Sequence, residues 1–176
     1  MATPGTTTST TKKTPRAPAK PDATRLLTQD HKEVDALFKA YDKLVKSEAD
    51  GSERQPLAEQ ICLMLTVHTT IEEEIFYPAA KAAGVQLGLL DEAEVEHASA
   101  KELIAQIRAM TPDEDLYDAK VTVLGEYIRH HVKEEHDELF PQCRKAPMDL
   151  KELGAELAAR KAELMSEMTE GQEASS

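Results

Sequence analysis

The most regular feature of this chain is a recurrence of apolar residues at three- and four-residue steps, which starts near residue 22 and continues almost to the end. Steps of this size place apolar side chains on one face of a helix. We therefore expect five helices, over approximately residues 23–47, 55–83, 89–110, 112–145 and 149–169. The last stretch has fewer large apolar residues, so we expect it to pack outside the other four.

Proline and glycine mark the expected helix ends. Pro56 suits a first helical turn and Gly84 suits a helix end, because these positions tolerate a missing N–H group and a left-handed backbone respectively. Pro78 should bend the second helix. The segment from Thr111 to Glu114 has the sequence of a capping box with proline at the first helical position. It predicts that the fourth helix starts at residue 112.

Four long helices with short connections predict an all-α, up-down-up-down four-helix bundle. We expect this bundle to occupy residues 22–146. Residues 1–21 are rich in Thr, Pro, Ala and Lys and contain no acid, and we expect a disordered basic tail there. Residues 147–176 are expected to form an additional C-terminal amphipathic helix and a short tail.

The charge and composition of the chain limit the partners and the cellular location that we expect for it. The 176 residues have a net charge of -12, which makes nucleic acid and anionic membranes poor partners for the bundle. No stretch approaches the ~20 apolar residues that span a bilayer, and the N-terminus lacks the apolar core of a secretion signal. Two cysteines do not make a disulfide framework; we expect Cys62 to be buried and Cys143 to be more exposed. These features favour a cytoplasmic protein.

Two similar segments carry the candidate chemistry. His68 and His131 each stand four residues before a glutamate, and each segment then has an acidic residue, an aromatic residue and a proline. On a helix, positions i and i+4 lie on the same face. Each segment therefore offers one imidazole and one carboxylate side by side.

Two more histidines, His31 and His97, lie on the apolar faces of the first and third helices. A single histidine on such a face is usually a hydrogen-bonded core residue. In an up-down bundle, however, all these groups fall in a layer roughly 9 Å thick at 1.5 Å rise per residue, and unrelated core histidines would have no reason to share a level. The candidate metal ligands are His31, His68, Glu72, His97, His131 and Glu135.

Six ligand groups exceed the needs of one tetrahedral zinc ion, and two buried carboxylates need cations beside them. We therefore expect two metal ions bridged by Glu72 and Glu135, each with two histidines. This mixture of imidazole and carboxylate ligands suits iron or manganese better than calcium or copper.

Other polar residues near these ligands are weaker candidates. His130 points about 100° away from His131 on the same helix, at 3.6 residues per turn, and His136 is also off the apolar face. We expect both at the surface or behind the ligands, with a further ligand from one of them left open. Glu73, Glu74, Glu134 and Glu138 are expected to be solvated, although Glu138 could also hydrogen-bond a ligand from outside.

Four motifs occur in a fixed order: Asp30-His31, His68-x3-Glu72 with Phe76-Tyr77-Pro78, Glu96-His97, and His131-x3-Glu135 with Phe140-Pro141. In order, spacing and helix placement they resemble the hemerythrin family, specifically its HHE cation-binding branch, over about residues 24–145. The resemblance implies a non-haem centre of two iron ions with an oxo or hydroxo bridge in addition to the two glutamates.

The chain departs from the oxygen-carrying members of this family at two positions. Their third helix supplies two histidines four residues apart, but here the second position is Lys101. They also place an aspartate where this chain has His136, and Glu135 takes the carboxylate role here. These departures argue against reversible oxygen carriage. Lys101 could hydrogen-bond a metal-bound anion or peroxide, or it could simply extend to solvent.

Two functions of different class stay open. One is a binding protein whose di-iron centre takes O2, NO or iron itself for sensing, scavenging or storage. The other is an enzyme that acts on peroxide or nitric oxide or repairs iron clusters. We favour binding, because no sequence element beyond the ligands indicates a substrate pocket or an electron-donor domain. A ferritin-like oxidase is disfavoured because its Glu-x-x-His pair occurs only once here, at Glu94 to His97; an acidic bundle without metal is the remaining alternative.

Overall fold

The computed structural model describes residues 21–173, with side chains as far as Gly171, so almost all of the expected basic tail lies outside the described residues. All regular structure within this range is helical. In chain order the elements are α1 (Ala23–Lys46), α2 (Gly51–Ile71), the π-helix η1 (Glu72–Phe76), α3 (Tyr77–Ala82), α4 (Leu87–Arg108), α5 (Tyr117–Glu134), the π-helix η2 (Glu135–Leu139), α6 (Phe140–Lys145) and α7 (Leu150–Glu173).

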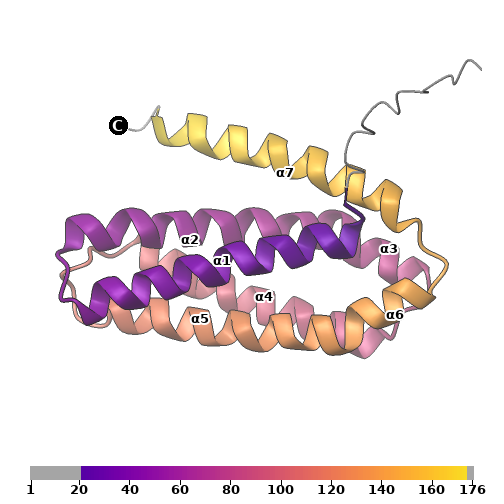
Figure 1. Cartoon of the computed structure of the whole chain (residues 1–176), viewed down its shortest axis with the longest axis horizontal. Helices are drawn as coiled ribbons and strands as arrows, with labels where there is room; N and C mark the ends of the chain where they lie inside the picture. Colours follow the sequence, from indigo (N-terminus) through magenta and orange to yellow (C-terminus); the bar gives the residue numbers. More distant parts are fainter. Residues whose placement is uncertain (1–20, 174–176) are drawn as a thin grey trace, which may run out of the picture.

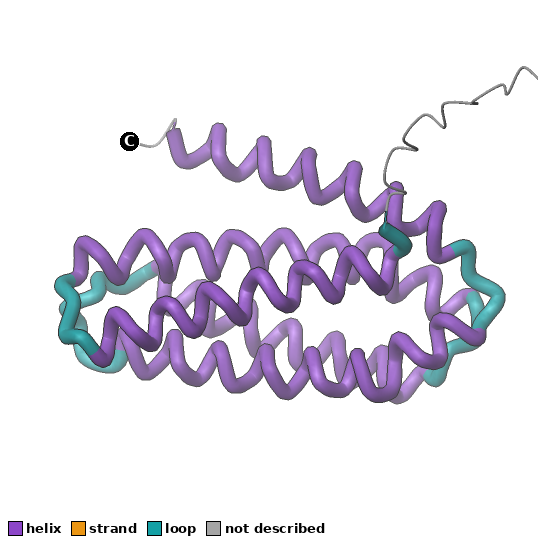
Figure 2. Tube along the Cα trace, in the orientation of Figure 1, coloured by secondary structure: helices purple, strands orange, loops and turns teal. Residues whose placement is uncertain are grey.

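The elements from α1 to α6 form four rods, because α2, η1 and α3 follow one another without a break, as do α5, η2 and α6 (Figure 1). The rods close into a ring: α1 packs against α2 and α5, and α4 packs against the same two helices. The loops that join them lie at the two ends of the bundle (Figure 2). The predicted four-helix bundle is therefore confirmed.

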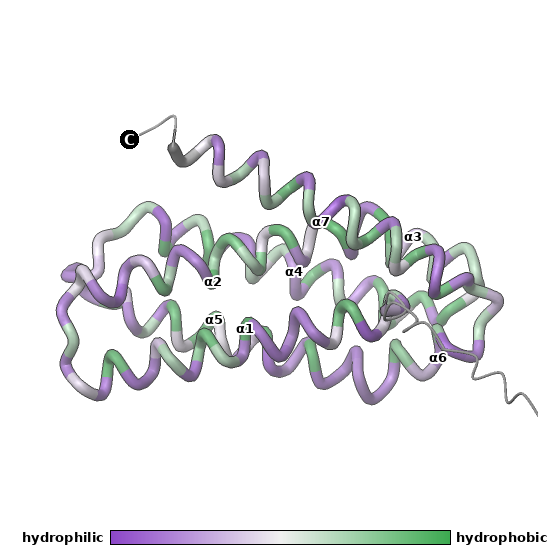
Figure 3. The backbone as a smooth tube through the Cα atoms, turned by 45° about the horizontal axis from the view of Figure 1, so that its top comes forward, coloured by the Kyte–Doolittle hydropathy of each residue, from purple (hydrophilic) through white to green (hydrophobic). Residues whose placement is uncertain are grey.

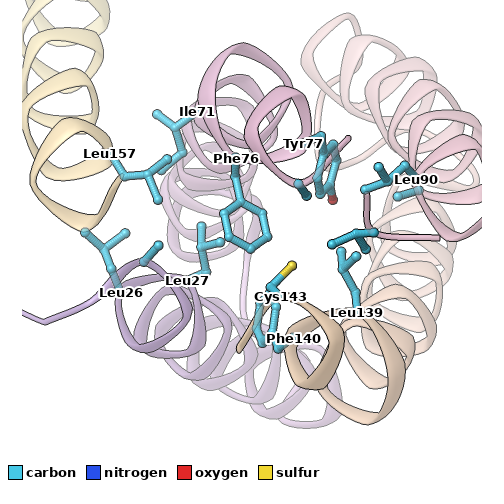
Figure 4. Close-up of a cluster of buried hydrophobic side chains, with 14 of the residues drawn as sticks. Leu26, Leu27, Ile71, Phe76, Tyr77, Leu90, Leu139, Phe140, Cys143 and Leu157 are labelled. Carbon is cyan, nitrogen blue, oxygen red and sulfur yellow. The ribbon is translucent and has the colours of Figure 1, made fainter. Parts of the chain in front are cut away.

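The C-terminal helix is an addition to this ring, as expected. α7 packs against α1, α2 and η1, and Leu157 points toward Ile71 and Leu26 (Figure 4). Gly154 allows the close approach, because a Cβ atom there would lie 2.5 Å from the backbone oxygen of Pro21. Figure 1 shows α7 leaving the bundle at an angle toward its C-terminal end.

Aspartates define three of the helix starts. The side chains of Asp22, Asp50 and Asp149 accept hydrogen bonds from backbone N–H groups in the first turns of α1, α2 and α7, which satisfies donors that the helix itself leaves unpaired. Because Asp50 caps α2, this helix begins at Gly51 and not at the predicted residue 55.

The predicted start of the fourth helix is also wrong. Thr111 and Glu114 do form hydrogen bonds like those of a capping box, with the Thr111 amide donating to Glu114 Oε1 over 2.8 Å. The chain nevertheless turns instead of continuing as a helix, since Leu116 adopts a left-handed conformation with φ 73°. α5 starts at Tyr117, and Leu116 is 68% exposed.

The alternation of hydrophobic and hydrophilic positions along the helices (Figure 3) produces two buried clusters. The first contains Phe76, Phe140 and Cys143 and lies where α3, α6 and α7 meet α1 (Figure 4). The second contains Phe38 and Tyr41 and lies toward the other end of the bundle. Cys62 is buried as predicted, but Cys143 is also buried, which corrects the expectation that it is more exposed. Across residues 21–173, no helix is both long enough and apolar enough to cross a membrane.

Candidate metal centre

A polar layer separates the two apolar clusters. The six side chains that the sequence singled out all lie in it, and His68, the most exposed of them, is only 7% exposed. His31 comes from α1, His68 and Glu72 from the second rod, His97 from α4, and His131 and Glu135 from the fourth rod. The structure therefore brings all six together from all four rods.

The histidines form two pairs whose Nε2 atoms converge. The Nε2 atoms of His31 and His68 are 3.0 Å apart, and those of His97 and His131 are 3.2 Å apart. Two imidazole lone pairs repel at such distances unless a proton or a cation lies between or beside them. Each pair is therefore arranged as two ligands of one positive centre.

Each glutamate lies between the two histidine pairs. Glu72 directs Oε1 to His68 Nε2 at 3.2 Å and Oε2 to His97 Nε2 at 3.3 Å. Glu135 directs Oε2 to His31 Nε2 at 3.2 Å and to His131 Nε2 at 3.7 Å. Both carboxylates thus have the position of a bridge between two centres.

A wide helical turn begins at each of these glutamates. The Tyr77 amide donates to the Glu72 carbonyl, and the Phe140 amide donates to the Glu135 carbonyl, so each turn spans five residues instead of four. A proline follows each turn and has no N–H group to donate to the regular helical partner. The irregularity expected at Pro78 is this π-turn, a feature common at functional sites.

In each of the four candidate ligand histidines, the second ring nitrogen contacts a residue on the side away from the converging Nε2 atoms, which we call its outer partner. The Nδ1 atoms of His31, His68, His97 and His131 lie near His136 Nε2 (3.2 Å), Asp30 Oδ2 (3.5 Å), Glu73 Oε1 (3.0 Å) and Glu96 Oε2 (2.7 Å) respectively. A carboxylate at Nδ1 holds the proton on that nitrogen and leaves the Nε2 lone pair free, which is how ligand histidines are oriented. His136 can do the same through its own neutral nitrogen, and burial, followed by the charge of His31, lowers its pKa.

Tyr77 is a part of the site that sequence reasoning treated only as a motif residue. Its hydroxyl is 3.0 Å from Glu135 Oε1 and 3.4 Å from Glu72 Oε2, and also 3.3 Å from His97 Nε2. Burial, followed by the charges of Glu135 and Glu72, raises the pKa of Tyr77 well above its ordinary value. The hydroxyl therefore keeps its proton and donates to the carboxylates.

The charge balance of the layer favours cations. Burial alone would lower the pKa of His68, but Glu72 and Asp30 outweigh burial and raise it to about 10. Burial alone would raise the pKa of Glu72, yet His68 and His97 hold it well below its usual range. Both shifts show that these carboxylates stabilise positive charge beside them, which a metal ion supplies in place of protons.

Two atoms give a direct test of whether a metal fits. Among the residues that the structure describes, Glu72 Oε1 and Glu135 Oε2 are the buried side-chain atoms without a hydrogen-bond partner. An unpaired buried carboxylate oxygen is strongly unfavourable, and both atoms lie beside converging Nε2 atoms. Two donor groups follow, one of His31, His68, Glu72 and Glu135 and one of Glu72, His97 and His131. The residues fit a pair of metal cations.

The weaker candidates for the site differ in where the structure places their side chains. Lys101 turns away from the Nε2 atoms and forms an ion pair with Glu73, 2.5 Å from its Oε2. His130 has a 66% exposed side chain and lies beside Glu96 and Glu134 outside the layer. Glu138 is exposed, whereas Glu73, which was expected to be solvated, is the outer partner of His97.

The site has an internal two-fold pattern that could have revealed these outer partners. In each half, the acid before the first histidine (Asp30 or Glu96) holds the second histidine of the same half. The residue after each glutamate (Glu73 or His136) holds the first histidine of the opposite half. The signal was present in the aligned repeats, although Glu73 and His136 differ in type.

A four-helix bundle with a buried layer of four imidazoles and two carboxylates, each imidazole held from outside, defines a metal-binding bundle. Comparison with known proteins specifies its kind: the chain belongs to the family described as the Hemerythrin HHE cation binding domain, whose match covers residues 22–143. The resemblance found from the motifs is therefore confirmed, and cation binding is the property that the family and the site share.

Two relatives were compared. The crystal structure of a hemerythrin HHE cation binding domain-containing protein from Mycobacterium kansasii superposes with a TM-score of 0.67 at 25% identity, over 83% of this chain and 88% of that one. A protein of Nostoc sp. (strain PCC 7120) named DNA nickase is 29% identical over 119 residues, which are 68% of this chain. The chain spans only 32% of the length of that curated relative.

Proposed function

We propose that this chain is a non-haem di-iron protein that binds O2, NO or iron itself for sensing, scavenging or storage. The observation that carries the proposal is the pair of glutamates set between two converging histidine pairs. Two sites joined by carboxylates, with imidazoles completing each, suit iron, with manganese as the alternative. Bound there, iron would supply an open coordination position for a small ligand.

The residues around the ligands support this role. Each outer partner fixes an imidazole with Nε2 directed inward, so the ligands are oriented before a metal arrives. Tyr77 adds a hydroxyl that holds a proton between the two glutamates. The Lys101–Glu73 pair keeps the ammonium group outside the ligand layer, so Lys101 does not replace the second histidine of the oxygen-carrying members.

The second candidate is a di-iron enzyme that acts on peroxide or nitric oxide or in iron-cluster repair. The proton on Tyr77 is the observation that favours it, because a hydroxyl beside both carboxylates could supply a proton to a ligand. The two candidates differ in turnover, which can be measured directly.

The deciding experiment compares the iron-loaded protein with His68→Ala. Stoichiometric, reversible spectral changes on adding O2 or NO, without consumption of hydrogen peroxide or NO, would support binding. Catalytic removal of hydrogen peroxide that is lost in His68→Ala would refute the binding proposal and support the enzyme. His130→Ala is the matched control, since this exposed histidine lies outside the ligand layer.

We also propose that nucleic acid and membranes are not partners. The net charge of -12 disfavours contact with phosphate groups, although the Nostoc relative bears the name DNA nickase. Incubation of the metal-loaded protein with supercoiled plasmid should leave the plasmid intact; nicking that disappears in His68→Ala would refute this.

The two buried, unpaired cysteines fit a reducing compartment, so we propose a cytoplasmic location, which cell fractionation would test.

A further inference from the structure

A cavity of about 270 Å³ adjoins the metal centre. All four candidate ligand histidines contribute to its wall, but Glu72 and Glu135 do not. The rest of its inner wall is mainly apolar and comes from α1, α2 and α5, with Val34, Leu65, Val67 and Ile128 among the contributors. This cavity could not be predicted from the sequence, because the apolar part of its wall consists of ordinary core residues.

The outer wall of the cavity includes α7. Lys161 and Met165 contribute from this helix, and Met64 faces the same space from α2. Lys161 Nζ lies 2.5 Å from Asp30 Oδ1, so the cation at the rim is already paired with a carboxylate. Glu33, the other charged residue of the wall, is exposed and accepts a hydrogen bond from the Gln29 amide. The interior therefore offers mainly apolar surface and imidazole rings.

The size of the cavity indicates the class of ligand. A dry cavity of about 150 Å³ lined by Leu, Ile and Phe accommodates benzene, and one water molecule occupies about 30 Å³. A diatomic gas would fill only a small part of the space beside these histidines. We propose that the cavity binds an uncharged apolar organic molecule, about the size of a substituted benzene, directly beside the metal centre.

This inference deepens the proposed function, because the position of the ligand next to the metals rests on the proposed metal binding. Binding of the apolar molecule itself depends only on the cavity. The two claims can therefore fail separately, and the experiment measures them separately.

Methionine methyl groups provide the readout. The full-length protein, labelled with 13C at its methionine methyls and loaded with iron or with a diamagnetic zinc substitute, is titrated with toluene. The resonances of Met64 and Met165 should shift saturably, whereas Met110 and Met148, which lie outside the cavity wall, should not move. Benzenesulfonate, which has a similar size but a negative charge and is a very weak metal ligand, should bind at least 10-fold more weakly.

Filling the cavity should abolish this binding. Met165→Trp places a large side chain in the space and should weaken toluene binding at least 10-fold while the metal content stays unchanged. Met168→Trp, one turn away on the same helix and not part of the wall, is the matched control and should bind toluene like the unmodified protein. If Met165→Trp loosens α7, Leu63→Phe fills the same cavity from α2.

Three outcomes would overturn the inference: shifts distributed over all methionines, equal binding of toluene and benzenesulfonate, or unchanged toluene affinity in both filled variants. Loss of metal binding with toluene binding retained would instead refute the proposed function and leave the cavity as an apolar binding site. Iron analysis of each sample distinguishes these cases.

Discussion

At the scale of single residues, the site depends on side chains that orient the ligand candidates through hydrogen bonds. The six ligand candidates supply the inward-facing nitrogens and oxygens, but their orientation comes from Asp30, Glu73, Glu96 and His136, none of which faces inward. Tyr77 adds one proton donor at the centre. Changes at these supporting residues should therefore alter metal binding without removing a ligand.

Tyr77→Phe tests the central hydroxyl. It removes the donor to Glu135 and Glu72, and we expect the protein to retain two iron ions while its affinity falls roughly 10-fold, as for other groups that support ligands. The measurement is competition with a chelator, together with the optical spectrum. Tyr41→Phe is the matched control, because Tyr41 lies in the apolar cluster with Phe38 and its hydroxyl donates to Asp118. This change should lower stability by about 1 kcal/mol without changing iron affinity. Equal iron affinity in both variants would contradict the role of Tyr77.

Glu96→Gln tests the outer partners. The carboxylate lies 2.7 Å from His131 Nδ1, and its replacement should reduce metal affinity about 10- to 100-fold because the imidazole loses its orienting partner. Glu94→Gln, an exposed change two residues away on the same helix, should have no effect. An unaltered affinity in Glu96→Gln would show that the orientation of His131 has another source.

The cysteines lead to a prediction about pH. Burial is the main cause that raises the pKa of Cys62 to about 11 and that of Cys143 to about 12, compared with about 8.5 for an unfolded thiol. Folding thus favours the neutral thiol, so this contribution to stability is present below about pH 8.5 and is lost as the pH rises toward the folded values. The native protein should resist a thiol reagent at pH 8 and react at both cysteines in urea. Rapid labelling of either thiol in the native protein would contradict their burial.

The meeting of the six ligand candidates in one layer could be predicted from sequence because the twin segments repeat and because all six groups share a depth in a bundle. The outer partners could not be predicted in the same way. Glu73 is the middle residue of three consecutive glutamates, and its position within the π-turn directs it to His97. His136 was placed off the apolar face correctly, but its contact with His31 depends on how α1 lies against the fourth rod.

At the scale of elements, the boundaries departed most from expectation. Apolar periodicity identifies the middle of a helix, whereas its ends depend on individual hydrogen bonds and backbone conformations. The Asp50 side chain extends α2 toward the N-terminus, and the left-handed Leu116 delays α5. The two π-turns were also not predicted, because each is defined by a single backbone hydrogen bond, from Tyr77 to Glu72 or from Phe140 to Glu135, and a search for apolar periodicity does not identify such a bond.

Gly154→Ala tests how α7 is held. The added Cβ atom would lie 2.5 Å from the Pro21 backbone oxygen and 2.8 Å from the Ala23 nitrogen, and neither neighbour is a flexible side chain. We expect α7 to shift and stability to fall by about 1–3 kcal/mol, measured by urea unfolding. Gly88→Ala in α4 has open space around the added atom and should be neutral or slightly stabilising. Unchanged stability in Gly154→Ala would mean that the close approach of α7 to α1 is not required.

At the scale of the whole molecule, the chain consists of two helical halves that meet at the metal centre. Each half supplies two histidines and one glutamate, and each places an outer partner against the other half. The apolar clusters lie above and below this layer, so the polar groups are enclosed by packing on both sides. α7 breaks the symmetry, because it covers the α1–α2 side alone.

We propose that this layer binds two metal ions, and metal analysis of the full-length protein is the decisive measurement. After aerobic loading with iron and removal of excess metal, we expect two ions per chain, unchanged in His130→Ala and strongly reduced in His68→Ala. Fewer than one ion per chain in the unmodified protein, or equal loss in both variants, would contradict it.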